Sequence, residues 1–97
     1  MKREAVVAIL TEHLEQLRDE YGVRQLLLFG SVARDEAGPG SDVDVLVEFD
    51  RPTGLFGLFQ LQDRLAELLG CPVDLGTVEG LKPRMRRRVQ QELVRVA

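Results

Sequence analysis

Two aspartates in one short segment carry the chemistry that the sequence offers most clearly. Asp42 and Asp44 stand two positions apart at the start of the apolar run Val43–Phe49. If this run is a strand, the two side chains share a face, with backbone positions about 6.6 to 6.8 Å apart. Half-buried carboxylates repel each other, and a hard divalent cation removes that repulsion. Mg²⁺ prefers one or two carboxylates with water and phosphate, so the pair predicts a magnesium site; solvated acids at a strand entry are the alternative.

A second group of residues is suited to holding phosphate. Gly30 and Ser31 follow an apolar run that ends at Phe29. Glycine lets the backbone approach a phosphate closely, and serine offers a hydroxyl and a free N–H at the start of a helical turn. Arg34, one turn further on, could reach the same anion or form a surface ion pair.

The apolar pattern predicts the elements that would position these residues. Apolar side chains recur every three or four positions over residues 3–20, which indicates one amphipathic helix ended by Gly22. Residues 54–69 carry leucines on one face and indicate a second helix, ended by Gly70 and Pro72. Short apolar runs indicate strands over residues 23–29, 43–49 and 73–75.

The remaining segments complete the expected fold. Residues 30–41 are rich in Gly and Pro and indicate a loop, with one helical turn after Ser31. Pro83 can open a last helix with an apolar residue at every fourth position, although residues 93–96 could instead finish as an edge strand. Helices and strands alternate, so we expect an α/β (α+β) class with one small sheet, as a single domain over residues 1–97.

The composition excludes several classes of protein. The single cysteine, Cys71, cannot form an internal disulfide or a zinc module built on paired thiols. Aromatic residues make up 5% of the 97 residues, so a base-stacking surface for nucleic acid is not expected. Glu4 stands where a signal peptide would turn apolar, and the apolar stretch 5–10 is too short to cross a bilayer. We expect a cytoplasmic protein that does not enter membranes.

The charge is unevenly distributed. From Gly80 onward there are six basic residues and one acidic residue, whereas residues 1–79 carry 7 basic and 15 acidic residues. The basic cluster Lys82–Arg88 is suited to an anionic ligand or an acidic partner, and equally to a solvated helix face. A basic nucleic-acid binder would rest on this cluster alone.

The two groups of candidate residues together form a longer pattern. In order along the chain it reads Gly30-Ser31, ten further residues, Asp42-Val43-Asp44 and then Val45-Leu46-Val47-Glu48-Phe49. This pattern resembles the signature of the DNA polymerase β-type nucleotidyltransferase superfamily, and the chain is similar in length to its minimal nucleotidyltransferases. The resemblance extends to Ala33-Arg34, Ser41 and Pro72-Val73-Asp74-Leu75. It implies a polymerase β-like fold, a small mixed sheet flanked by helices.

The resemblance also implies roles for the site residues. Asp42 and Asp44 match the acids that bind two Mg²⁺ ions in that family. Asp74 matches its third carboxylate, which would hold the metal nearest the incoming hydroxyl and could accept its proton; a water-facing acid on an edge strand is the alternative. Gly30 and Ser31, with Arg34, would bind the triphosphate. No adenine pocket is evident in the sequence, so ATP is implied by the family alone.

The implied reaction is transfer of AMP from ATP to a hydroxyl. Minimal nucleotidyltransferases are typically encoded beside a HEPN-domain partner, and several modify a tyrosine of that toxic ribonuclease. The resemblance therefore predicts an antitoxin that acts as a protein adenylyltransferase on a HEPN toxin. A nucleotidyltransferase for a small molecule and a non-catalytic antitoxin that acts by binding alone are the alternatives, and the oligomeric state stays open.

Overall fold

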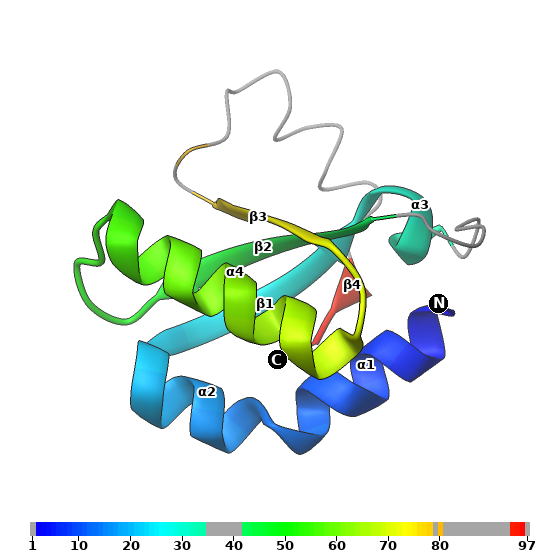
Figure 1. Ribbon diagram of the computed structural model, residues 1–97, viewed down its shortest axis with the longest axis horizontal. Helices are drawn as coiled ribbons and strands as arrows, with labels where there is room; N and C mark the ends of the chain where they lie inside the picture. Colours follow the sequence, from blue (N-terminus) through cyan, green and yellow to red (C-terminus); the bar gives the residue numbers. More distant parts are fainter. Residues whose placement is uncertain (1, 35–41, 79, 81–93, 97) are drawn as a thin grey trace.

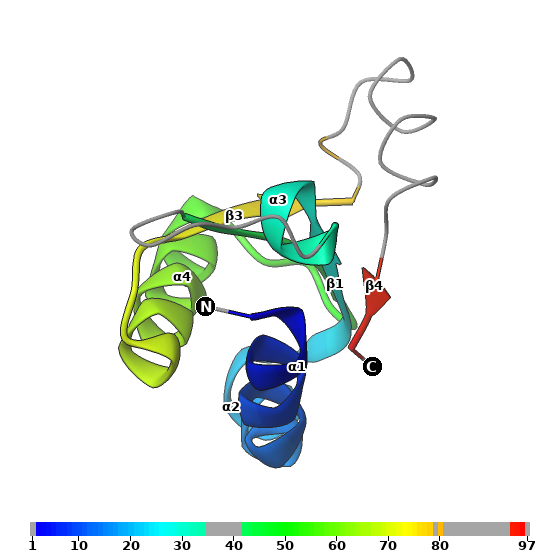
Figure 2. The ribbon, with the colours of Figure 1, turned by 90° about the vertical axis from the view of Figure 1, so that its right-hand side faces the viewer.

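The computed structural model describes residues 2–34, 42–78, 80 and 94–96. In this part of the chain, a four-stranded sheet carries helices on one face (Figures 1 and 2). The helices are α1 (Arg3–Glu12), α2 (Leu14–Tyr21), α3 (Gly30–Ala33) and α4 (Leu55–Leu69). The strands are β1 (Val23–Phe29), β2 (Val43–Phe49), β3 (Val73–Thr77) and β4 (Val94–Arg95).

The sheet is mixed, as expected. Its strand order is β3-β2-β1-β4, with β1 antiparallel to both β2 and β4, and β2 parallel to β3. The predicted strand over residues 73–75 extends to Thr77, because β3 stays paired with β2 as far as Val47. The expected class, a small mixed α/β sheet flanked by helices, is confirmed.

The core lies between the sheet and the helices. Val43, Val45 and Val47 on β2 pack with Leu61 and Leu65 of α4 and are fully buried. A smaller cluster on the opposite face joins two buried leucines to two half-buried residues: Leu27, Leu46, Phe29 and Val78. Because side chains alternate along a strand, Asp44 projects with Leu46 to the face away from α1, α2 and α4.

One predicted helix is wrong in its extent. Instead of a single helix over residues 3–20, the segment forms α1 and α2, which meet at His13. The backbone N–H of His13 donates to the carbonyl of Ile9 at 3.3 Å, and Nδ1 of its ring lies 2.9 Å from the same oxygen. The side chain thus competes for the carbonyl that closes the helical turn, and His13 leaves the helical conformation with φ −102° and ψ 5°.

The other predicted boundaries are confirmed where the structure describes them. Gly22 and Gly70 end α2 and α4 in the left-handed conformation. The helical turn expected near Ser31 is α3. The alternative of a C-terminal edge strand is confirmed for Val94–Arg95, which pairs with β1. The helix expected from Pro83 and the basic cluster Lys82–Arg88 lie outside the described residues.

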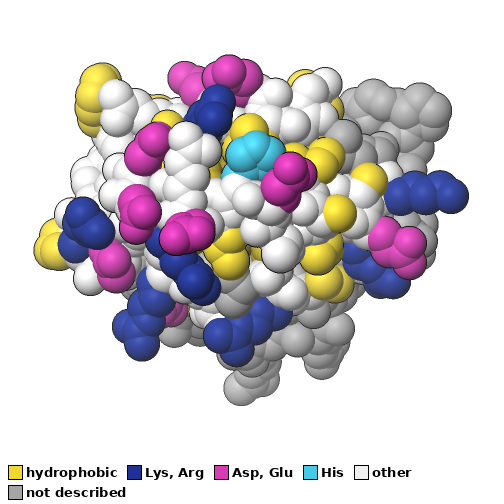
Figure 3. Space-filling model, turned by 90° about the horizontal axis from the view of Figure 1, so that it is seen from below, with side chains coloured by type: hydrophobic (Ala, Val, Ile, Leu, Met, Phe, Trp, Pro, Cys, Tyr) yellow, Lys and Arg dark blue, Asp and Glu magenta, His cyan; other side chains and the backbone are white. Residues whose placement is uncertain are grey.

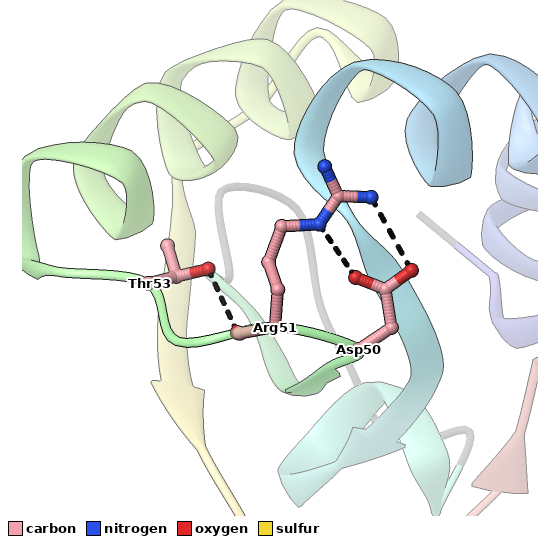
Figure 4. Close-up of polar contacts among 3 residues, drawn as sticks. All are labelled: Asp50, Arg51 and Thr53. Carbon is pink, nitrogen blue, oxygen red and sulfur yellow. Dashed lines mark hydrogen bonds and ion pairs between the residues drawn. The ribbon is translucent and has the colours of Figure 1, made fainter.

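The turn after β2 is stabilised by local polar contacts (Figure 4). Arg51 donates from Nε to Asp50 Oδ1 at 2.7 Å and from Nη2 to Oδ2 at 3.3 Å, while the Thr53 hydroxyl donates to the carbonyl of Arg51. The guanidinium lowers the pKa of Asp50. The two opposite charges thus pair with each other within this exposed turn.

The surface seen from the helical side carries acidic and basic side chains interspersed with apolar ones (Figure 3). Among the described residues on this face, the charges are mixed and form no continuous basic stripe of the kind that attracts a phosphate backbone. Among the helices described, none is long and apolar enough to cross a bilayer.

Core packing gives a first prediction. Leu61 is 0% exposed, so Leu61→Ala removes buried apolar volume and should lower the free energy of unfolding by about 2 to 5 kcal/mol. Phe56, on the same helix, is 78% exposed, and Phe56→Ala should change it by less than about 0.5 kcal/mol. Urea unfolding followed by circular dichroism measures both. Equal losses in the two variants would contradict the assignment of the buried face of α4.

Candidate active site

The sheet topology brings the predicted residues to one end of the molecule. β1 and β2 are antiparallel, so Phe29, the last residue of β1, pairs with Asp44 near the start of β2. β2 and β3 are parallel, so Asp74 near the start of β3 pairs with Asp44 from the other side. Neighbouring strands lie about 4.8 Å apart, and directly paired residues project to the same face. Asp44 and Asp74 therefore share the sheet face away from the helices, and α3 lies at the same end (Figure 1).

Gly30 makes room for the central carboxylate. Its φ of +72° lies in the left-handed region, which turns the chain sharply out of β1 and into α3. A Cβ at this position would collide with Oδ2 of Asp44. Glycine therefore suits the left-handed backbone conformation here, and any side chain at this position would oblige the Asp44 carboxylate to shift.

Asp44 is the electrostatic centre of the candidate site. Partial burial raises the pKa of Asp44, and the negative charges of Asp74 and Asp42 raise it further. Arg34, exposed just after α3, acts in the opposite direction and lowers it. Asp42, Asp74 and Arg34 thus all lie within electrostatic range of Asp44. Ionised carboxylates this close repel one another, and a bound cation would relieve that repulsion.

The two flanking acids are open to solvent. Asp42, which directly precedes β2, and Asp74 on β3 are both exposed, whereas Asp44 is half-buried. Gly30 and Ser31 open α3, and the side chain of Ser31 lies outside the part that the structure describes. A ligand can therefore reach Asp42 and Asp74 from solvent without displacing the core.

The donor chemistry at this end fits a hard divalent cation. Mg²⁺ takes one or two carboxylates and completes its shell with water and phosphate oxygens, and this end offers carboxylates on adjacent strands. In the described ranges, no three Asp, Glu, His or Cys side chains already form a group that could hold an ion. The metal-binding roles of Asp42, Asp44 and Asp74 stay predictions.

Two residues that the sequence reasoning missed contact elements of this site. Arg3 on α1 donates from Nη1 to the carbonyl of Ala33 at 3.1 Å and holds the end of α3. Gln62 on α4 accepts a hydrogen bond from the backbone N–H of Leu75 on β3 at 3.1 Å. The two residues of the first hydrogen bond lie 30 positions apart in the sequence, and those of the second lie 13 apart, so no local spacing indicates either contact.

Comparison with known proteins identifies the family of this chain. A family model described as a nucleotidyltransferase domain matches residues 10–96. The chain belongs to this nucleotidyltransferase family. The nucleotidyltransferase is 41% identical over 93 residues to the protein adenylyltransferase MntA of Thermococcus cleftensis, with 96% of this chain and 94% of that relative aligned. The resemblance to the nucleotidyltransferases is thus confirmed.

Solved structures have the same fold. A structure assigned as a minimal nucleotidyltransferase is similar to this nucleotidyltransferase with a TM-score of 0.80 and 37% identity, covering 97% of this chain and 95% of that one. A chain in a complex of the tri-AMPylated HEPN toxin of Shewanella oneidensis with MNT antitoxin gives a TM-score of 0.68 at 17% identity, covering 94% of this chain and 71% of that one. The second likeness shows the fold alone.

Proposed function

We propose that this nucleotidyltransferase transfers AMP from ATP to a tyrosine hydroxyl of a HEPN-domain toxin, with release of pyrophosphate, and thereby acts as an antitoxin. The observation that carries the proposal is the pairing of Asp44 with Asp74 across β2 and β3, with Gly30 against the Asp44 carboxylate. The 41% identity to a protein adenylyltransferase supports AMP as the group transferred and a protein as the acceptor.

In this proposal the acids hold two Mg²⁺ ions and direct the acceptor. Asp42 and Asp44 would hold both ions, which would supply neutralisation of the negative charge of the phosphates during transfer. Asp74 orients the incoming hydroxyl and accepts its proton. Asp74 is suited to this role because its carboxylate is exposed beside the half-buried Asp44, where an acceptor can reach it.

The turn between β1 and α3 holds the triphosphate in the same proposal. Gly30 lets the backbone approach the phosphate oxygens, and Ser31 offers its N–H and hydroxyl to them. Arg34, which already acts on Asp44 electrostatically, also pairs with a phosphate. Transfer then depends on positioning and charge neutralisation, since no covalent intermediate on the protein is required.

A protein acceptor fits the open character of this end of the sheet. Asp42, Asp74 and Arg34 are all exposed, so the described part of the chain leaves room for a partner to complete the site. The complex of an AMPylated HEPN toxin with its MNT antitoxin, which shares the fold, supports a HEPN-domain partner. We propose this partner in preference to a small-molecule acceptor.

Mass spectrometry tests the proposed reaction. The purified chain, incubated with ATP and Mg²⁺, should add one or more AMP units to the HEPN-domain protein encoded beside it, and peptide mapping should place them on tyrosine. An aminoglycoside serves as the alternative acceptor. Modification of the aminoglycoside alone would replace the proposed acceptor with a small molecule. Neutralisation of the toxin without modification would support the alternative of binding alone.

A further inference from the structure

Among the strands that the structure describes, β3 lies at one edge of the sheet, and a side chain from α4 pairs with its outer side. Gln62 accepts the N–H of Leu75 at 3.1 Å through its side-chain carbonyl. An edge strand exposes backbone groups that a neighbouring strand would otherwise pair. Gln62 therefore supplies, at this one position, the acceptor that a further strand would supply.

The register shows why this hydrogen bond lies on the outer side. The N–H of Val43 on β2 donates to the carbonyl of Pro72 at 3.0 Å, just before β3. In a parallel ladder, alternate residues direct their backbone groups to the same neighbour. Pro72 and Asp74 therefore face β2, whereas the N–H of Leu75 faces outward, where Gln62 meets it.

The group that Gln62 holds is the peptide bond that joins Asp74 to Leu75. The carbonyl of Asp74 and the N–H of Leu75 belong to one planar unit, which cannot rotate about its own bond. By the alternation of the ladder, its carbonyl side is directed at β2, and Gln62 holds its N–H side. The unit is thus held from both sides, and with it the direction in which the Asp74 side chain leaves the backbone.

We propose that Gln62 is a positioning residue for Asp74: it fixes the peptide unit that carries this carboxylate and so keeps it beside Asp44. This inference rests on the proposed function, in which Asp74 directs the acceptor hydroxyl. The position of Gln62 is itself secure, because its neighbours on α4, Leu61 and Leu65, are fully buried in the core. Because α4 is packed into the core, the side chain of Gln62 is held in a fixed position beside β3.

The test uses three variants of the full chain. Gln62→Met keeps the length of the side chain and removes the acceptor, whereas Gln62→Glu keeps an acceptor oxygen at the same reach. Gln60→Met is the matched control, because Gln60 is an exposed glutamine two positions earlier on α4. Each is assayed for kcat and for KM with ATP in AMP transfer, and for exchange of the Leu75 amide hydrogen by NMR without nucleotide.

The expected results separate positioning from general stability. In Gln62→Met the Leu75 amide should exchange up to about tenfold faster, and kcat should fall about tenfold with KM for ATP unchanged. Gln62→Glu should recover most of kcat, and Gln60→Met should match wild type. In the Asp74→Asn background, Gln62→Met should lower kcat no further, because its effect passes through Asp74.

Other results would overturn the inference. If kcat in Gln62→Met matches that in Gln60→Met, or if Gln62→Met lowers kcat equally with and without Asp74, then Gln62 does not act through Asp74. An unchanged exchange rate at Leu75 would refute the hydrogen bond itself. If the wild-type chain transfers no AMP, the proposed function fails first and the inference falls with it. That outcome is visible before any variant is assayed.

Discussion

Replacing Asp42 and Asp44 together with asparagine should slow AMP transfer by about a thousandfold or more, while the protein stays folded. Asparagine keeps the shape of each side chain and removes its negative charge. In the proposed site these two acids hold both Mg²⁺ ions, so the variant loses the charge neutralisation on which transfer depends. Single-turnover assays with ATP, Mg²⁺ and the HEPN-domain partner measure the loss.

A matched control separates loss of the site from loss of a carboxylate on the same strand. Glu48 lies on β2 and alternates in phase with Asp44, but at the far end of the strand, where it pairs with Arg24 at 3.3 Å. Because an exposed ion pair contributes about 0 to 1 kcal/mol, Glu48→Gln should keep its fold and a rate close to wild type. Equal rates in Glu48→Gln and in the double variant would remove Asp42 and Asp44 from the proposed site.

The double variant should not be less stable than wild type. Burial, and then the charges of Asp74 and Asp42, raise the pKa of Asp44. A carboxyl with a raised folded-state pKa favours folding below its unfolded-state pKa, and this contribution is lost as pH rises through the folded-state pKa. At neutral pH, ionised Asp44 therefore opposes folding. Without Mg²⁺, the Tm of the double variant should equal or exceed that of wild type at pH 7, with a smaller difference in strong acid.

The same variant distinguishes catalysis from contact in cells. If transfer neutralises the toxin, the variant should fail to protect cells that express the partner, although it still folds. Continued protection, together with loss of AMP transfer in vitro, would mean that binding alone neutralises the toxin. The proposed antitoxin mechanism would then be wrong even though the enzyme activity is real.

Local patterns in the sequence were sufficient to predict most of the elements. Along β2, the buried valines at positions 43, 45 and 47 alternate with side chains that project to the opposite face of the sheet. This period of two identifies both the strand and its buried face. Periodicity could not reveal the break at His13, because the apolar spacing from Leu10 to Leu17 continues across it. There the ring of His13 contacts the carbonyl of Ile9, and that contact has no signature in hydrophobicity.

The helices and strands follow from local sequence patterns, whereas the arrangement of the candidate site depends on tertiary structure. The Asp42 and Asp44 pair is visible in the spacing. The pairing of Asp74 with Asp44 depends on strand order, which residue patterns do not indicate; the family resemblance pointed to Asp74 as the third carboxylate without giving that order. The contact between Gln62 and Leu75 joins an α4 side chain to a strand edge. Such a contact exists only once the helix and the strand have packed, so the linear sequence does not indicate it.

Gly30→Ala should disable the site in a second way, without removing any functional group. A non-glycine residue at φ +72° costs about 1 to 3 kcal/mol of stability. In addition, the new Cβ would collide with Oδ2 of Asp44, so either the carboxylate or the turn into α3 has to move. A displacement of about 1 Å at a reacting centre lowers the rate about a hundredfold, and we expect that loss in kcat per folded molecule.

The chain offers a control that isolates the collision from the backbone strain. Gly70 has nearly the same conformation, with φ +69°, but no atom lies within 4 Å of the position that its Cβ would occupy. Gly70→Ala should therefore lose similar stability in urea unfolding while keeping its kcat per folded molecule. Equal kcat values in Gly30→Ala and Gly70→Ala would show that the contact between Gly30 and Asp44 is unimportant for transfer. A loss confined to Gly30→Ala would attribute the requirement for glycine to the carboxylate beside it, because strain alone is common to both variants.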